Sequence, residues 1–166
     1  MNILKLELTH FGKFHLKTIT FTSGLNIVYG KNEAGKSTIH AFVRSMLFGI
    51  PDTEEGNERY SHYLPWETPH DFCGRMWIKK DDKVYRIERN FLRPQPTVRV
   101  FDDETGESLQ PAKQHLRQIL SGLTETSYLN TICIEQLKSA TDPQLAKELE
   151  DMAVNASRSK NLNIDV

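Results

Sequence analysis

A short run from Gly30 to Ser37 matches the spacing Gly-x-x-x-x-Gly-Lys-Ser/Thr without a mismatch. Glycine permits the positive φ angles and the close approach that a loop needs to turn its backbone N–H groups toward a phosphate. Lys36 would supply a charge to the β- and γ-phosphates, and the Ser37 hydroxyl would be a ligand of Mg²⁺. The segment therefore predicts binding of a nucleoside triphosphate with Mg²⁺, through Gly30, Lys31, Asn32, Glu33, Ala34, Gly35, Lys36, Ser37 and Thr38.

The flanking sequence predicts the elements that must position this loop. Residues 24–29 predict a strand that leads into the loop, with Leu25, Ile27 and Val28 as its apolar side chains. Residues 36–48 predict a helix, because apolar side chains recur there at helical spacing. The positive N-terminal end of that helix would point at the bound phosphate. Two short strands, at 3–8 and 16–21, precede these elements.

The rest of the chain predicts a different kind of structure. Residues 49–71 contain several prolines and many charges, and they predict a long exposed loop. Residues 73–91 predict a hairpin that turns at Asp81 and Asp82, with a third strand at 97–103. A helix is expected from Pro111 to Leu120 and another from about Pro143.

Composition narrows the class of protein. The chain has 166 residues, which is enough for one domain with its own core. Its net charge of −1 gives no argument for binding nucleic acid or a membrane surface, and no apolar stretch is long enough to span a bilayer. Cys73 and Cys133 lie far apart and form neither metal-ligand nor redox spacing. A reduced cytoplasmic protein is the expectation.

A carboxylate that would support hydrolysis is hard to find. Such a residue ends a buried apolar strand, and the best match is the segment Val98–Glu104, with Asp102 or Asp103 in that role. Arg99 interrupts the apolar run, and prolines precede it, so an edge strand followed by an exposed turn is favoured. An Asp-x-x-Gly motif begins at Asp103, but the guanine-reading Asn-Lys-x-Asp segment of GTPases is missing from the sequence.

Several segments together resemble the start of a YhaN-type ATPase, in the wider group that contains SbcC, RecF, RecN and the SMC proteins. The matching segments are Ile-Leu-Lys-Leu-Glu-Leu-Thr-His-Phe-Gly-Lys-Phe at 3–14, the loop and its strand at 24–38, Phe42–Gly49, the residues Arg59, Tyr60, Pro65 and Trp66, and Glu-Gln-Leu with Gln136.

The resemblance implies an α/β fold: the N-terminal half of a P-loop NTPase head of the ABC/SMC type, with a parallel core sheet and an antiparallel β-subdomain. In such proteins a coiled coil follows, and a C-terminal half supplies the signature, the Asp-Glu strand end and a switch histidine. The expected division is a single half-head over 1–166. Its first part, 1–50, would hold the strands, the phosphate loop and the first helix, and an exposed loop at 51–71 would follow. The remaining parts would be an antiparallel hairpin region at 72–102, a helical segment with the glutamine loop at 103–141, and a helix toward the coiled coil at 142–166.

The resemblance also implies roles. Lys36 and Gln136 would be the catalytic residues, with Gln136 touching Mg²⁺ and the attacking water. ATP would join two heads and its hydrolysis would release them, while this chain alone would hydrolyse ATP negligibly. Many relatives place an arginine near the phosphates after the first strand. Gly12 stands at that point here, and either Lys13 or His10 could substitute.

Partners implied by the resemblance are the missing C-terminal half-head and coiled coil, a second head, DNA and a nuclease subunit, but no membrane. Residues 75–101 are rich in basic side chains that could contact DNA phosphates. These are Arg75, Lys79, Lys80, Lys83, Arg86, Arg89, Arg93 and Arg99. A solvated sheet face is the alternative interpretation of this block.

Two rival functions stay open. A small self-sufficient P-loop nucleotide kinase would fit the length, but such a kinase alternates strands and helices, whereas the middle of this chain predicts an antiparallel hairpin group. A non-enzymatic module that dimerises or binds DNA with an empty phosphate loop is the other. Titration with Mg-ATP and an assay for phosphoryl transfer would separate these functions.

Overall fold

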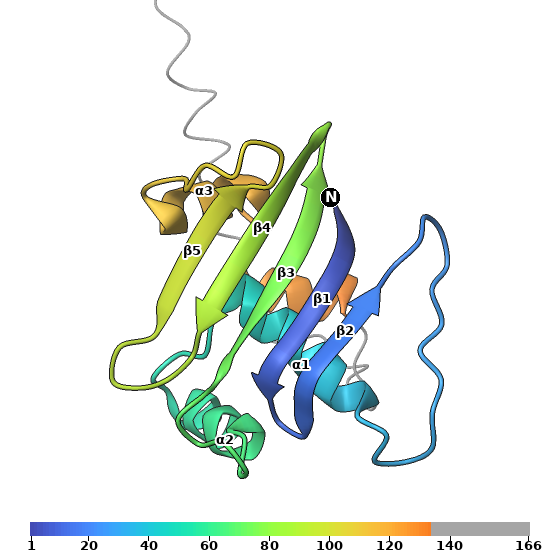
Figure 1. Ribbon diagram of the computed structural model, residues 1–166, viewed down its shortest axis with the longest axis vertical. Helices are drawn as coiled ribbons and strands as arrows, with labels where there is room; N and C mark the ends of the chain where they lie inside the picture. The colour runs from blue at the N-terminus through green and yellow to red at the C-terminus, as the bar shows by residue number, and fades with distance from the viewer. Residues whose placement is uncertain (134–166) are drawn as a thin grey trace, which may run out of the picture. The chain divides into compact units, whose positions relative to one another are not determined.

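The computed structural model describes residues 1–133, which fall into two units, Met1–Gly122 and Leu123 onward. The first unit contains a five-stranded sheet in the order β2-β1-β3-β4-β5, in which every neighbouring pair is antiparallel (Figure 1). The strands are β1 (Asn2–Phe11), β2 (Phe14–Thr20), β3 (Cys73–Lys80), β4 (Lys83–Asn90) and β5 (Thr97–Asp102). The helices of this unit are α1 (Lys36–Phe48), α2 (Glu54–Tyr63) and α3 (Ala112–Ile119).

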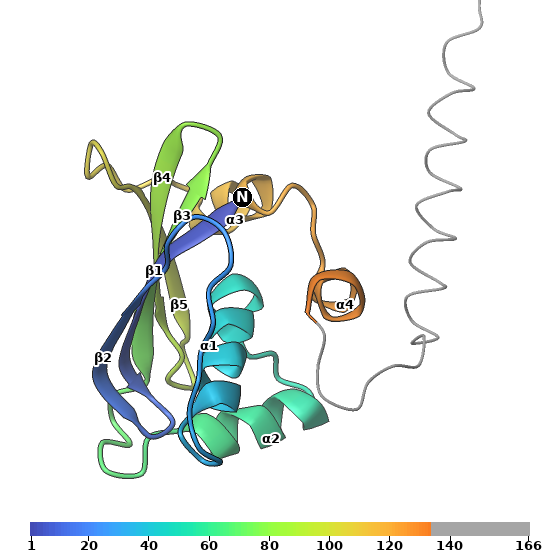
Figure 2. The same cartoon turned by 90° about the vertical axis from the view of Figure 1, so that its right-hand side faces the viewer.

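One face of the sheet is apolar and covered by helices. Alternate residues of the strands point to the same face, and those of the covered face are fully buried. They are Leu6, Leu8, Met76, Ile78, Ile87 and Val100. Helix α1 packs Phe42, Met46 and Leu47 against this layer. Figure 2 shows α1, α2 and α3 on one side of the sheet, so the other side of the sheet is the outer face.

A cluster of aromatic rings joins the phosphate-loop helix to the rest of the unit. The ring of Phe11, at the end of β1, has its centroid 5.1 Å from that of Phe42 in α1 and 5.3 Å from that of Tyr63 in α2. Phe72 and Phe91 lie at 5.2 and 5.6 Å from the same ring. Phe11 is fully buried, so it anchors the β1–β2 hairpin to both helices.

Arginine side chains hold the C-terminal end of α1. The Nε of Arg89 donates to the carbonyl of Met46 at 2.7 Å, and its Nη2 donates to that of Leu47 at 3.2 Å. Arg59 donates to the carbonyl of Gly49 at 3.3 Å. The last carbonyls of a helix have no partner within the helix and carry its negative end. Burial of the guanidinium lowers the pKa of Arg89 to about 10, which still leaves it charged at neutral pH.

We expect Arg89→Met to destabilise the first unit. Methionine keeps much of the apolar stem, but two helix carbonyls lose charged donors, so the free energy of unfolding should fall by about 1–3 kcal/mol. The matched control is Arg99→Met on β5, where the side chain is 64% exposed and makes a surface ion pair; its effect should stay below about 0.5 kcal/mol. Urea denaturation measures both, and equal losses would contradict the anchoring role of Arg89.

Two expectations about this part of the chain are not met within the described residues. Residues 25–29 form no strand, and the described sheet contains no parallel pair. No strand of the described residues lies beside this segment to supply hydrogen bonds, so its apolar composition alone does not produce one. Residues 51–71 are not only a loop, because α2 lies within them. Thr53 caps α2 by accepting a hydrogen bond from Gly56 N at 3.2 Å.

The hairpin expected at 73–91 is confirmed, as are the helix at 36–48 and a helix close to 111–120. Helix α3 packs against β5. Lys80 donates to the carbonyl of Gln118 and, at 2.8 Å, to the hydroxyl of Ser121, so it holds the C-terminal end of α3 to the β3–β4 hairpin. Within the described part, the search found no helix long and apolar enough to cross a bilayer.

The second unit is described up to Cys133. It contains the short helix α4 (Glu125–Ser127) and the π-helical turn η1 (Tyr128–Ile132). Thr124 caps α4 by accepting from Ser127 N at 3.1 Å. Gln136 and the helix expected after Pro143 lie outside the described residues, so their roles stay predictions.

Candidate phosphate-binding site

The loop between β2 and α1 ends as a cradle at residues 30–37. Helix α1 begins at Lys36, and Gly35 before it has φ 101°, in the left-handed region that favours glycine. No side chain caps this helix N-terminus. In the described part of the chain, no backbone acceptor engages the amides of Gly35, Lys36 or Ser37. These amides are therefore available to an anion, and the helix dipole favours its negative charge.

The side chain of Lys36 lies within this cradle. Its Nζ donates to the carbonyls of Gly30 at 2.6 Å and Lys31 at 2.8 Å. Both Lys36 and Ser37 are exposed, so a ligand can reach them. The Lys36 ammonium group donates only to loop carbonyls and has no carboxylate partner among the described residues. Its positive charge is therefore not neutralised and can attract a phosphate.

The β1–β2 turn forms one wall of the cradle. Lys13 donates from Nζ to the carbonyl of Glu33. A Cβ added to Gly35 would overlap the ring of Phe14, with its Cε2 at 2.8 Å, so the ring packs directly on the glycine. Glycine at position 35 is thus required by its φ angle and by the neighbouring ring. The contact between Phe14 and the loop depends on tertiary structure, so it could not be predicted from the sequence.

The same turn is held from its other side. Gly12 N donates to the carbonyl of Tyr63 at 2.7 Å. A Cβ at Gly12, where φ is 56°, would lie 2.9 Å from Cγ2 of Thr38 in the first turn of α1. The β1–β2 turn therefore packs between α1 and the end of α2. This close packing determines the position of Lys13, the next residue of the turn.

Only one of the two residues suggested in place of an arginine reaches the cradle. His10 Nδ1 lies 3.0 Å from the hydroxyl of Thr68 and 3.3 Å from Nδ1 of His15. Lys13 contacts the loop directly. Lys13 and Lys36 therefore bring two ammonium groups to carbonyls of the same loop.

The two acidic residues considered for hydrolysis have other partners: Asp102 holds the turn after β5, and Asp103 contacts β3 and β4. Backbone N–H groups of Thr105 and Glu104 donate to Asp102 at 3.3 and 3.1 Å and hold the pKa of that carboxyl below its usual range. Asp103 accepts from Trp77 Nε1 at 3.0 Å. β5 is the edge strand opposite β2, so the edge-strand interpretation is confirmed.

The basic block at 75–101 is split between the two faces of the sheet. Arg89 holds α1, as described above. Arg93 stacks over the ring of Tyr60, with Cζ 4.5 Å from the ring centroid, and donates to the carbonyl of Pro51 at 3.1 Å. Only part of the block, including Arg75, Arg86 and Arg99, therefore occupies the outer face.

The residues present fit a nucleotide polyphosphate with Mg²⁺. The N-terminus of α1 offers three backbone amides without a hydrogen-bond acceptor within residues 1–133, namely those of residues 35–37. The ammonium groups of Lys13 and Lys36 lie on the same loop, and the exposed Ser37 hydroxyl is in the first turn of the helix. In the described residues, no group of three or more histidine, cysteine or acidic side chains could hold a metal by itself. The metal would therefore depend on the nucleotide, as is usual for Mg²⁺ at phosphates.

Comparison with known proteins shows the family of this chain. A family described as AAA domain matches residues 1–153. The uncharacterized protein YhaN of Bacillus subtilis (strain 168) is 43% identical over 56 residues, which are 33% of this chain and 6% of YhaN. The DNA double-strand break repair Rad50 ATPase of Thermococcus kodakarensis is 26% identical over 146 residues.

The Rad50 match covers 82% of this chain and 15% of the relative, so the chain spans only a small part of the length of both proteins. The similarity to YhaN and to a Rad50 ATPase confirms the resemblance drawn from the sequence motifs. The match over most of the chain shows that the protein belongs to the AAA domain family of P-loop ATPases.

Proposed function

We propose that this chain is the ATP-binding N-terminal half of an ATPase head of the SbcC/SMC/YhaN type. The observation that carries the proposal is the cradle, with partnerless amides at the start of α1 and the two lysines Lys36 and Lys13 on its loop. Lys36 and Lys13 would bind the phosphates, Ser37 would bind Mg²⁺, and Gln136 would contact the metal and the attacking water. The residues Gly30–Thr38 would wrap the polyphosphate.

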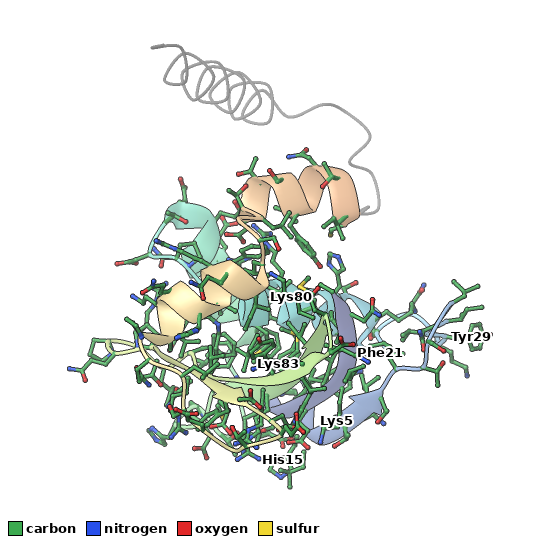
Figure 3. The ribbon with its side chains drawn as sticks, turned by 90° about the horizontal axis from the view of Figure 1, so that it is seen from above. Lys5, His15, Phe21, Tyr29, Lys80 and Lys83 are labelled. Carbon is green, nitrogen blue, oxygen red and sulfur yellow. The ribbon has the colours of Figure 1, made fainter. Side chains whose placement is uncertain are left out.

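The segment before the cradle supports the idea that a second half completes the head. Leu25, Ile27, Val28 and Tyr29 are 87%, 79%, 44% and 95% exposed. No backbone hydrogen bond engages residues 25–29 within the described part of the chain. Figure 3 shows Tyr29 pointing away from the body of the first unit. A mostly apolar segment whose backbone groups make no hydrogen bonds within the described residues is a template for strand pairing.

We infer that residues 25–29 become a strand of a parallel core sheet when the C-terminal half joins. That half would also bring the base for hydrolysis, since Asp102 holds the turn after β5 and Asp103 accepts a hydrogen bond from Trp77. ATP would then join two such heads, and its hydrolysis would separate them. DNA and a nuclease subunit are the proposed further partners, and the cytoplasm is the proposed location.

Calorimetric titration of this chain with Mg-ATP tests the proposal. We expect saturable binding to one site, reduced by about 100-fold in Lys36→Ala, because a charge-assisted bond to phosphate is lost. Lys113→Ala is the matched control, since it removes one exposed positive charge from α3 and should leave the affinity for Mg-ATP unchanged. An assay of phosphate release should show negligible hydrolysis by the chain alone.

Robust ATP turnover that Lys36→Ala abolishes would contradict the division of the active site between two halves. Failure to bind Mg-ATP would favour a module that uses only its surfaces. Phosphoryl transfer to nucleoside monophosphates would favour the kinase alternative, although the antiparallel sheet is unlike the alternating arrangement of such enzymes.

A further inference from the structure

The outer face of the sheet carries charged and aromatic side chains in ordered rows. Residues directly opposite each other on neighbouring strands share a face. One row is Lys5, Trp77, Arg86 and Phe101. The next row, about 7 Å along the strands, is Glu7, Arg75, Glu88 and Arg99. Figure 3 shows Lys5 on the side of the sheet away from α3.

Glu88 is the centre of the second row. Its carboxylate lies 3.3 Å from Nε of Arg75, 3.2 Å from Nε of Arg86 and 3.0 Å from Nη2 of Arg99. Glu7 also pairs with Arg75 at 3.5 Å, and Asp103 pairs with Arg86 at 3.4 Å. With Lys5, four cations therefore face three carboxylates, which leaves a small excess of positive charge on this face. The side chains of Arg75 and Arg99 are 53% and 64% exposed, which leaves donors of both facing solvent.

A cavity of about 210 Å³ lies beside these arginines. Arg75, Arg89 and Arg99 line it together with the Glu88 carboxylate and the neutral polar residues Thr9, Asn90 and Thr97. Asn90 and Thr97 are directly opposite each other on β4 and β5. Exposed guanidinium groups beside amide and hydroxyl groups are the donors that bind a phosphate group.

The first row adds aromatic rings next to this cavity. Lys5 Nζ lies 3.5 Å from the centroid of the Trp77 ring, and Arg86 Cζ lies 4.6 Å from that of Phe101. Trp77 Nε1 donates to Asp103, which fixes the orientation of the ring. Stacking of a nucleobase on such a ring is stronger than the contact of an exposed cation, so a base can displace the lysine.

We propose that the outer face binds single-stranded nucleic acid, with one phosphate in the cavity between Arg75 and Arg99 and a base on Trp77 or Phe101. Glu88 is the positioning residue, because its carboxylate pairs with both arginines at the edge of the cavity. A single strand can offer phosphates and unstacked bases to the two rows at once, whereas a duplex keeps its bases inside. This inference rests on the proposed function in one respect, the proposal that DNA is a partner of the protein.

The test uses the fluorescence of Trp77 in a Trp66→Phe background, which leaves one tryptophan in the chain. Titration with oligothymidine should quench this fluorescence, because a stacked base contacts the ring. A duplex of the same length should bind more weakly and quench little. Fluorescence anisotropy of labelled oligothymidine gives the affinity at several salt concentrations.

The double variant Arg75→Ala/Arg99→Ala should lower the affinity at least about 10-fold and reduce the slope of log K against log salt by about 1–2. The matched control is Lys113→Ala/Arg117→Ala on α3, which removes the same charge from exposed positions off the sheet. Thermal denaturation checks that both variants stay folded. Equal losses in the two double variants, no quenching of Trp77, or tighter binding to duplex would each overturn the inference.

Mg-ATP titration of the same variants separates this inference from the proposed function. Normal Mg-ATP binding without oligothymidine binding would overturn the outer-face site alone. Binding of oligothymidine that depends on Arg75 and Arg99, without any binding of Mg-ATP, would support this site and contradict the proposed ATP-binding role.

Discussion

Phe11→Ala should lower the free energy of unfolding of the first unit by about 3–5 kcal/mol. The ring is fully buried among rings from α1, α2 and the ends of β3 and β4, so its removal leaves a cavity that rigid neighbours cannot fill. A loss of this size is a large part of the stability of a typical domain. Chemical denaturation followed by circular dichroism measures it.

Tyr29→Ala is the control for that change. Its side chain is 95% exposed, so truncation should alter the free energy of unfolding by less than about 0.5 kcal/mol. A similar loss in both variants would mean that residues 25–29 pack in solution, and it would remove the main support for a missing strand partner.

Gly35→Ala should abolish Mg-ATP binding while the chain remains folded. Alanine at φ 101° is strained, and its Cβ would meet the Phe14 ring and approach Cε of Lys13 at 3.3 Å. Either the loop or the β1–β2 turn must move, which displaces the amides and both lysines together. We expect the affinity for Mg-ATP to fall by at least about 100-fold, equivalent to roughly 3 kcal/mol.

Gly106→Ala is the matched control, because it also has a positive φ, 73°, but nothing lies within 4 Å of the added Cβ. It should cost about 1 kcal/mol in stability and leave Mg-ATP binding unchanged. Unchanged binding in Gly35→Ala would show that the cradle does not need the geometry described for it.

Local patterns in the sequence predicted much of the fold. The α1 helix followed from the spacing of Phe42 and Met46, and the β3–β4 hairpin followed from alternation around a turn. Helix α2 was missed because its sequence is polar and has no clear apolar stripe. Residues 25–29 have a strand-like composition, but a strand also needs a neighbour, which a single segment cannot supply.

The candidate site was predictable only where its chemistry is local in sequence. The spacing of Gly30, Gly35 and Lys36 gave the cradle, and the acids near Asp102 were correctly favoured as turn residues. The choice of Lys13 over His10 needed the tertiary fold, because both lie close to the same turn. Basic residues recur throughout 75–101, so the sequence could not show that Arg89 contacts α1 whereas others of this block lie on the outer face.

The exposed, mostly apolar segment Leu25–Tyr29 has a consequence for the solubility of the protein. It combines high β-propensity with no charge and no proline, which is the composition of segments that stack into cross-β aggregates. At high concentration, two copies of the chain would meet first along this run. Solubility should therefore improve when a charge is introduced at Ile27, and purification together with the complementary half should protect the segment.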